Sequence, residues 1–155
     1  MGAKQGAEGE SDDYFLSTVS LGLELMEPSP QPPYDPRFLK GIEYFNVCDF
    51  FEAHEVWEEL WTEYSGPARK FYQGLIQVAV CLHHFGNGNI RGAKKLYNSS
   101  TAYLKDYGDE YHGIPLRQIL MQLEKCCRPI LDSTEEFPKI DIVPDDIPEI
   151  HLVQS

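Results

Sequence analysis

The chain has 155 residues, of which 42% are hydrophobic and 25% charged, and its formal net charge is −12. This length and composition predict a single domain with a full hydrophobic core. The negative charge argues against nucleic acid as the main partner and against docking on an anionic membrane, because both require a basic surface.

The four cysteines form no C-x-x-C pair, and three of them fall on apolar faces of predicted helices. This usage is typical of reduced thiols in a cytosolic compartment. The first ten residues lack the apolar core of a secretion signal, and no apolar run is long enough to cross a membrane. The sequence therefore predicts a soluble, cytoplasmic protein.

Residues 1–34 are predicted to form a disordered or extended N-terminal segment with one short helix. Residues 1–13 are polar and rich in glycine, which is typical of disorder. The pattern of residues 14–27 is compatible with a strand or a helix, and because no partner strand is evident we expect a helix. The four prolines that follow indicate an extended linker.

Residues 35–131 are predicted to form a compact helical bundle. Asp35, followed by a proline, is typical of the start of a helix, which we expect to run to about Phe45. A short connection leads to a second helix over residues 49–64, with Asp49 as its N-cap in an aspartate variant of the capping box. Because the connection is short, these two helices are expected to be neighbours.

The third predicted helix opens at Pro67 and is apolar nearly all round from Phe71 to Phe85, which indicates a buried central element. A fourth helix follows with Asn89 as its cap, and a fifth starts at Pro115. The predicted fold is therefore all-α, a compact bundle of about five helices around the third, with extended N- and C-terminal segments.

Residues 132–155 are predicted to form an extended, proline-rich tail. Its prolines alternate with isoleucines at a density that excludes a helix. We expect this tail to lie on the bundle as a strap. A tail that binds a protein partner is the alternative.

His54 and Glu58 interrupt the apolar pattern of the second helix. They are four residues apart and share a face at the margin of the stripe that contains Trp57 and Trp61. A carboxylate buried there is costly unless it is paired, protonated or bound to a metal. Two interpretations stay open, namely a buried structural pair and a polar pocket that binds a metal ion or a small ligand.

The spacing His54-x-x-x-Glu58-x-x-Trp61 resembles the H-x-x-x-E-x-x-[WY] signature of the small helical family called domain of unknown function 309. Three further stretches resemble the same family: F-N-x-x-x-F-F-E-A-H-E-V-W-E at residues 45–58, Y-Q-G-L-I-Q at 72–77 and G-N-x-x-G-A at 88–93. Together they cover roughly residues 38–105. The resemblance implies a helical fold and a metal-binding motif, but no reaction, because that family has no established biochemical activity.

The third predicted helix carries a line of polar side chains, Gln73, Gln77 and His84, on an otherwise apolar surface. Buried amides and imidazoles need hydrogen-bond partners. The simplest arrangement is that they face His54 and Glu58 across the contact between the two helices. The alternative is that they bond to backbone carbonyls or water elsewhere.

The predicted site is a pocket between the second and third bundle helices, with His54 and Glu58 as candidate metal ligands. Its predicted lining is Trp61, Gln73, Gln77 and His84. A mixed imidazole and carboxylate set suits a divalent transition metal, zinc or manganese, better than calcium or magnesium. No second histidine completes a zinc-protease motif, and no Glu-x-x-His pair completes a ferritin-like centre.

Whether the protein is an enzyme is left open, because no phosphate loop, nucleotide fingerprint or nucleophile elbow is present and no catalytic residue is identified. The alternative function is a non-enzymatic structural or protein-interaction domain. In that case His54–Glu58 is a buried structural pair, and the acidic surface or the C-terminal tail binds a protein partner.

Overall fold

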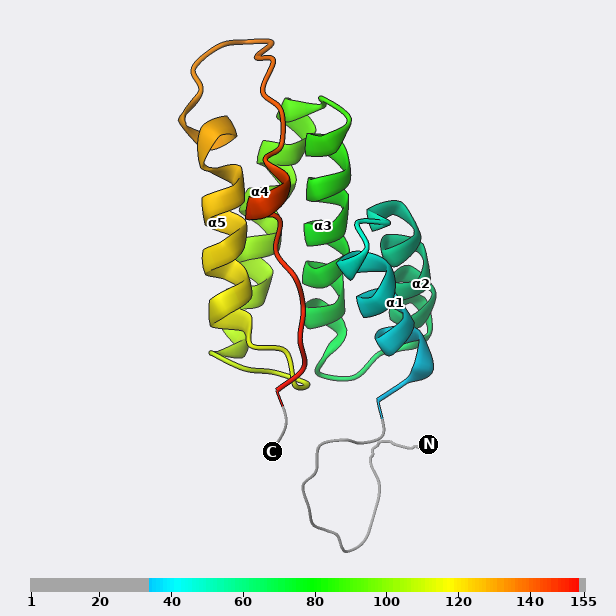
Figure 1. Ribbon diagram of the computed structural model, residues 1–155. Coiled ribbons are helices and arrows are strands. Elements are labelled where there is room, and N and C mark those ends of the chain that lie inside the picture. Colours follow the sequence, from blue (N-terminus) through cyan, green and yellow to red (C-terminus); the bar gives the residue numbers. More distant parts are fainter. Residues whose placement is uncertain (1–33, 154–155) are drawn as a thin grey trace, which may run out of the picture.

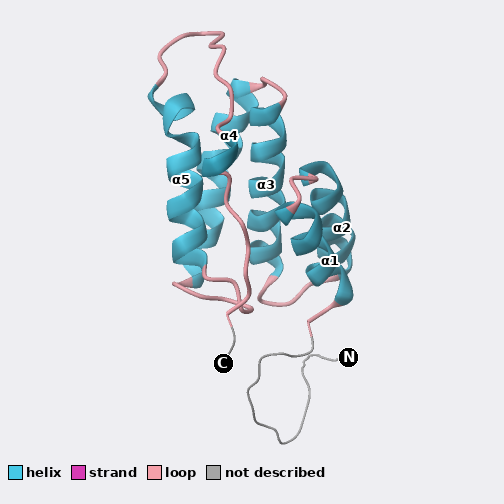
Figure 2. Ribbon diagram, in the orientation of Figure 1, coloured by secondary structure: helices cyan, strands magenta, loops and turns pink. Residues whose placement is uncertain are grey.

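A computed structural model of the chain describes residues 34–153. Within this range the chain forms five α-helices, two single-turn 3-10 helices and no β-strand (Figures 1 and 2). The predicted all-α bundle is therefore confirmed. The short helix and the linker predicted before residue 34 lie outside the described residues. None of the helices between residues 34 and 153 has the length and apolar character needed to cross a lipid bilayer.

The α-helices are α1 (Pro36–Asn46), α2 (Phe50–Glu63), α3 (Arg69–Gly86), α4 (Ile90–Leu104) and α5 (Leu116–Asp132). The 3-10 helix η2 (Lys105–Tyr107) follows α4, and η3 (Pro144–Asp146) interrupts the C-terminal segment. Helices that are consecutive in the chain pack against each other, and α3 lies between the α1–α2 pair and the α4–α5 pair (Figure 1). The predicted central position of α3 is confirmed.

Two of the predicted N-caps hold the first turn of their helix. Asp35 Oδ1 accepts a hydrogen bond from the backbone N–H of Arg37 at 2.8 Å, and Asn89 Oδ1 accepts one from that of Gly92 at 3.1 Å. The side chain of Asp49 makes no capping hydrogen bond, so the capping box predicted for α2 is wrong. The stability of α2 comes instead from packing of its apolar face.

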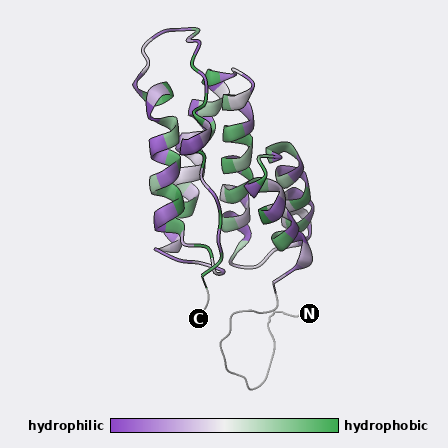
Figure 3. Ribbon diagram, in the orientation of Figure 1, coloured by the Kyte–Doolittle hydropathy of each residue, from purple (hydrophilic) through white to green (hydrophobic). Residues whose placement is uncertain are grey.

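The apolar faces of the helices meet in one continuous core. In Figure 3, α5 alternates between hydrophobic and hydrophilic residues along its length, as expected for a helix with one buried face. α3 differs, because its buried residues are distributed around the helix. They are Phe71, Tyr72, Gly74, Leu75, Val78, Ala79, Cys81, Leu82 and Phe85.

Trp57 makes the contact between α2 and α1. Its indole is fully buried, and Nε1 donates a hydrogen bond to the backbone carbonyl of Phe38 at 3.1 Å. Gly41 leaves room for it, since a Cβ there would lie 2.0 Å from the indole Nε1. The Trp57 ring therefore packs toward α1.

The C-terminal segment leaves α5 in a loop beyond the end of the bundle and then returns along it to Val153, passing between α5 and α3 in the view of Figure 1. The side-chain amide of Asn46 binds both backbone groups of Ile150, donating to its carbonyl and accepting from its N–H, each at 2.8 Å. The backbone N–H of Val153 donates to the carbonyl of Gly113 at 2.6 Å. The segment is therefore tied to α1 and to the loop before α5.

Candidate functional site

His54 and Glu58 lie one turn apart on α2, with His54 Nε2 at 3.6 Å from Glu58 Oε1. The side chain of His54 is 20% exposed and that of Glu58 is 55% exposed. The predicted burial of the pair is therefore wrong for Glu58. Its position at the margin of the apolar stripe lets the carboxylate extend into water, which avoids the cost of desolvation.

The orientation of the His54 ring is set by its own helix. Nδ1 lies 2.9 Å from the backbone carbonyl oxygen of Phe51. A carbonyl oxygen can only accept, so Nδ1 carries a proton and donates it. Nε2 therefore faces the Glu58 carboxylate, which is the group that could share a cation with it.

Phe51 connects the pair to α3. Its ring centroid lies 5.1 Å from that of His54 and 5.5 Å from that of His83, and the side chain is 45% exposed. His83, and not His84, is therefore the α3 histidine that reaches this surface. A helical wheel assigns residues to faces, but it does not say which neighbour each face meets.

The polar line on α3 does not face the pair as predicted. Ser99 of α4 donates a hydrogen bond to Gln77 Oε1 at 2.6 Å. His84 Nδ1 lies 3.2 Å from the side-chain nitrogen of Asn89, and burial, with His83 as a second cause, lowers the pKa of His84. Gln73 is half-buried and makes no hydrogen bond to His54 or Glu58 in the described part of the chain. Gln77 and His84 are therefore hydrogen-bonded to α4 and to its N-cap residue, and no hydrogen bond within residues 34–153 joins them to His54 or Glu58.

Trp61, the fourth predicted lining residue, is half-buried on α2. The guanidinium of Arg69 lies over its ring at 4.0 Å from the centroid, and Arg69 Nε donates to the carbonyl of Tyr64 at 3.1 Å. Trp61 therefore packs against the start of α3. Trp61 follows His54 by seven residues, or two turns of α2, as the spacing His54-x-x-x-Glu58-x-x-Trp61 predicts for a helix.

The residues present place a limit on the kind of metal that could bind. Between residues 34 and 153, no three His, Cys, Asp or Glu side chains come together in a group able to hold a metal ion. Structural zinc centres use four protein ligands and catalytic ones usually three. His54 and Glu58 do not fit either class. They fit a solvent-exposed site in which water fills the remaining positions.

His112, in the loop before α5, is a histidine that the sequence did not single out. Five aromatic ring centroids lie within 6.0 Å of its own, those of Tyr34, Phe38, Phe71, Tyr72 and Tyr111. The Tyr111 ring is stacked on it with an interplanar angle of 3°. Burial lowers the pKa of His112 to about 4. The neutral imidazole is therefore part of an aromatic core.

The backbone around His112 is a tight turn. Tyr111 and Ile114 exchange both backbone hydrogen bonds, at 3.0 and 2.9 Å, and the two residues between them have positive φ, 51° at His112 and 77° at Gly113. This pattern is a two-residue turn of type I′, in which glycine is favoured. The His-Gly pair was the available sequence signal for the turn, although not for the rings that enclose it.

Comparison with known proteins gives one family and two relatives. Residues 38–96 match a family described as a domain of unknown function, DUF309. An uncharacterized protein of Aquifex aeolicus (strain VF5) is 32% identical over 93 residues, which are 59% of this chain and 28% of the relative. The uncharacterized protein YpuF of Bacillus subtilis (strain 168) is 40% identical over 65 residues, 41% of this chain and 37% of the relative.

The chain therefore covers less than two thirds of the length of these relatives, 28% and 37%. The part that matches the family contains α2 and α3 and hence the His54–Glu58 pair. The family resemblance inferred from the sequence is confirmed, and this chain matches the DUF309 family, whose function is unknown, over residues 38–96.

Proposed function

We propose that the His54–Glu58 pair binds a divalent transition metal ion at the surface of α2, with water or a group of a bound molecule at the remaining coordination positions. One observation carries the proposal. The Phe51 carbonyl fixes the proton on Nδ1 and directs Nε2 toward the Glu58 carboxylate at 3.6 Å. Metal-binding histidines are commonly held in this way, with the second ring nitrogen donating to a backbone carbonyl.

The separation of the two groups supports a shared cation. Zinc–nitrogen and zinc–oxygen bonds of roughly 2.0–2.2 Å place neighbouring ligand atoms roughly 3–3.5 Å apart. Glu58 is more than half exposed, so a small rotation of its side chain closes the difference. An imidazole with a carboxylate suits zinc or manganese better than calcium or magnesium. With only two protein ligands, the bound ion is expected to exchange readily and to keep open positions.

The test is a calorimetric titration of the full chain with zinc and, separately, with manganese. Because Cys48 is exposed and could bind zinc, every protein in the series carries Cys48→Ser. We expect one ion to bind, with affinity lowered about tenfold or more by His54→Gln and by Glu58→Gln, the loss expected for one ligand. Unaltered binding in His54→Gln, or no binding to the parent, would refute the proposal.

The chain offers a matched control. His151 and Glu149 form a second His–Glu pair, with Nε2 at 2.9 Å from Oε1, and both side chains are well exposed. That pair lies on the C-terminal segment, and no backbone carbonyl of residues 34–153 holds its imidazole through a hydrogen bond. His151→Gln should leave the affinity unchanged. An equal loss in His151→Gln would show that any exposed His–Glu pair of this chain binds the ion.

A protein-interaction domain is the second candidate function, and the exposed ring of Phe51 beside His54 and His83 favours it. Aromatic side chains are enriched among the residues that dominate binding energy at interfaces. In this case no metal ion binds between Nε2 and Glu58. Phe51→Ser would then weaken association with the partner. The metal titration of the parent protein would give no signal.

A further inference from the structure

α3 reaches the surface of the bundle along one stripe. After its first turn, six side chains of α3 are not buried, and their spacing of three and four residues puts them on one side of the helix. α2 borders this side, where the ring centroids of Phe51 and His83 are 5.5 Å apart, and α4 borders it opposite, where Ser99 binds Gln77. The six residues form the α3 stripe: Gln73, Ile76, Gln77, Val80, His83 and His84.

The other side of α3 is covered by the C-terminal segment. Asn46 binds this segment to α1, and Lys125 binds it to α5, with Nζ at 3.5 Å from Asp146 Oδ1. The segment crosses in front of the bundle in the view of Figure 1. The α3 stripe is therefore the side of α3 that residues 34–153 leave open to solvent.

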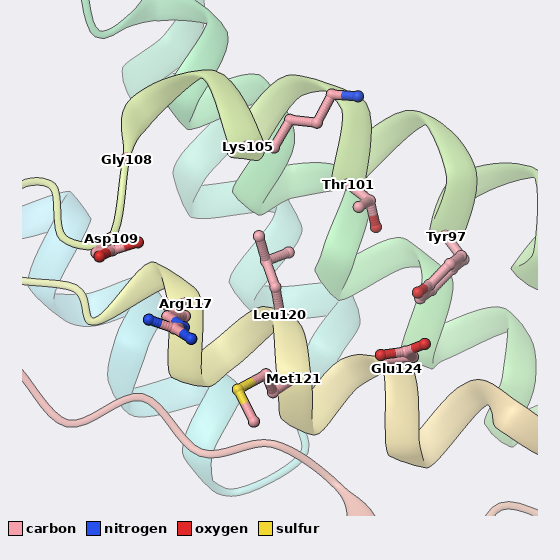
Figure 4. Close-up of a pocket in the computed structure, with 9 residues that line it drawn as sticks. All are labelled: Tyr97, Thr101, Lys105, Gly108, Asp109, Arg117, Leu120, Met121 and Glu124. Atoms are coloured by element: carbon pink, nitrogen blue, oxygen red, sulfur yellow. The ribbon is translucent and has the colours of Figure 1, made fainter.

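The α3 stripe contains no lysine, arginine, aspartate or glutamate. A helix face that meets water normally carries charged residues. The cleft between α4 and α5 follows this rule, because four of the side chains that line it are charged: Lys105, Asp109, Arg117 and Glu124 (Figure 4). Depletion of charged residues is typical of the core of a protein–protein interface. The α3 stripe therefore has the composition of an interface.

The residues of the α3 stripe are complementary to themselves. At a two-fold axis a residue meets its own counterpart in the second copy, so a charged side chain there would be repelled. A glutamine amide both donates and accepts, and hence can pair with a second glutamine. The side chain of Gln73 and the amide nitrogen of Gln77 have no hydrogen-bond partner among residues 34–153, and Val80 is partly exposed beside them. A second copy of this chain is therefore the partner that the stripe fits.

The helices on the two sides of the stripe carry opposite charges. On α2, Phe51 is followed at four and seven residues by Glu55 and Glu58, which therefore lie on the same side of the helix, beside α3. On α4, Lys95 precedes Ser99 by four residues and so lies beside α3 as well. Glu55 and Lys95 are exposed, and neither forms an ion pair within residues 34–153.

These opposite charges lie at similar levels of the bundle. Phe51 of α2 and Asn89, the N-cap of α4, each contact one of two adjacent histidines near the end of α3. At 1.5 Å per residue, Glu55 follows Phe51 by about 6 Å and Lys95 follows Asn89 by about 9 Å. A two-fold axis parallel to α3 therefore places α2 of one copy over α4 of the other, and Glu55 beside Lys95. An axis across α3 would instead place α2 on α2, and carboxylates on carboxylates.

We propose that the chain forms a two-fold dimer through the α3 stripe, in which Glu55 of each copy pairs with Lys95 of the other. Three adjacent helices of this length present a face of roughly 500 Å², less than the roughly 800 Å² that each partner of a stable complex buries. The dimer is therefore expected to be weak, with a dissociation constant of about 10–100 µM. This inference rests on the protein-interaction candidate, names a second copy as the partner, and does not depend on metal binding.

The test is sedimentation velocity of the full chain from about 5 to about 500 µM, with a chelator and a reductant present so that neither a metal ion nor a Cys48 disulfide can link two copies. We expect a concentration-dependent dimer. Glu55→Lys and Lys95→Glu should each weaken it about tenfold or more, because each places like charges at both Glu55–Lys95 contacts. Equimolar mixing of the two variants should restore the affinity of the parent, because every such contact between them then joins opposite charges.

The controls are Glu136→Lys and Lys139→Glu, which make the same changes in net charge at exposed positions of the C-terminal segment, away from the α3 stripe. Both should leave the affinity unchanged. A parent chain that stays monomeric up to about 500 µM would overturn the dimer. If the mixture of Glu55→Lys and Lys95→Glu associated no better than each variant alone, the proposed arrangement would be wrong. Because the chelator removes metal ions, either result leaves the metal proposal to the calorimetric titration.

Discussion

The surroundings of His54 and His112 are opposites. His54 lies on an exposed face of α2 beside a carboxylate, and its ring is held by one hydrogen bond to its own helix. His112 lies in a loop and is enclosed by five aromatic rings. The sequence motif identifies His54, whose ring is accessible to solvent beside a carboxylate. No motif identifies His112, although we expect its burial among aromatic rings to have the larger effect on the free energy of unfolding. The experiments below test that division, from the largest expected effect to the smallest.

The largest effect is expected from protonation of His112. Burial lowers its pKa to about 4 in the folded chain, from 6.5 as the ordinary value. Between these pH values the unfolded chain binds more protons, so the free energy of unfolding falls as the pH falls. The contribution is fully present above about pH 6.5, and about 3 kcal/mol is lost by about pH 4. Urea unfolding across this range measures the loss.

His112→Asn is the control for this measurement, because asparagine tolerates a positive φ and has no titratable ring. In this variant the pH dependence between about 6.5 and 4 should shrink to the part that carboxylates contribute. A variant with the same pH dependence as the parent would show that His112 does not titrate with folding.

The next effect concerns the turn that holds His112. Gly113 has φ of 77°, and a Cβ there would lie 2.7 Å from the Tyr34 hydroxyl and 3.3 Å from Leu152 Cδ2. We expect Gly113→Ala to lower the free energy of unfolding by about 2 kcal/mol, from backbone strain and overlap together. Gly88→Ala isolates the backbone part, because Gly88 has φ of 81° and no atom within 4 Å of the added Cβ. Equal losses in the two variants would contradict the overlap.

A smaller effect is expected where the C-terminal segment meets α1. Asn46→Ala removes both hydrogen bonds to the backbone of Ile150. The expected loss is about 1–2 kcal/mol, together with faster hydrogen exchange of the Ile150 amide. Asn98→Ala, at an exposed position of α4, is the control and should change neither quantity. Unchanged exchange at Ile150 would show that other contacts are sufficient to hold the segment.

The smallest effect is expected from His54→Ala. A partly buried imidazole that has one hydrogen bond to its own helix and a carboxylate partner more than half exposed contributes less than about 1 kcal/mol. Thermal unfolding without added metal measures it. If His54→Ala lowered the free energy of unfolding as much as protonation of His112 does, the His54–Glu58 pair would be a structural pair, and His54 would matter for stability as much as His112.

The structure shows which parts of the site could be predicted. The helical wheel correctly put His54 and Glu58 on one face, one turn apart, because that relation depends only on the geometry of a single helix. The wheel could not say that Gln77 pairs with Ser99 of α4 or that Trp57 packs on α1. Those contacts depend on the direction in which each neighbouring helix lies, and the pattern of one helix carries no information about it.

The sequence by itself determined what local interactions control: the five helices, the caps at Asp35 and Asn89, the apolar surface of α3 and the membership of His54 and Glu58 in one turn. Only the tertiary structure decided how exposed Glu58 is, what surrounds His112 and where the cleft between α4 and α5 opens. The physical reason is that burial and aromatic contacts arise between residues distant in the chain, such as Tyr34, Phe71 and His112, which come together only when the bundle closes.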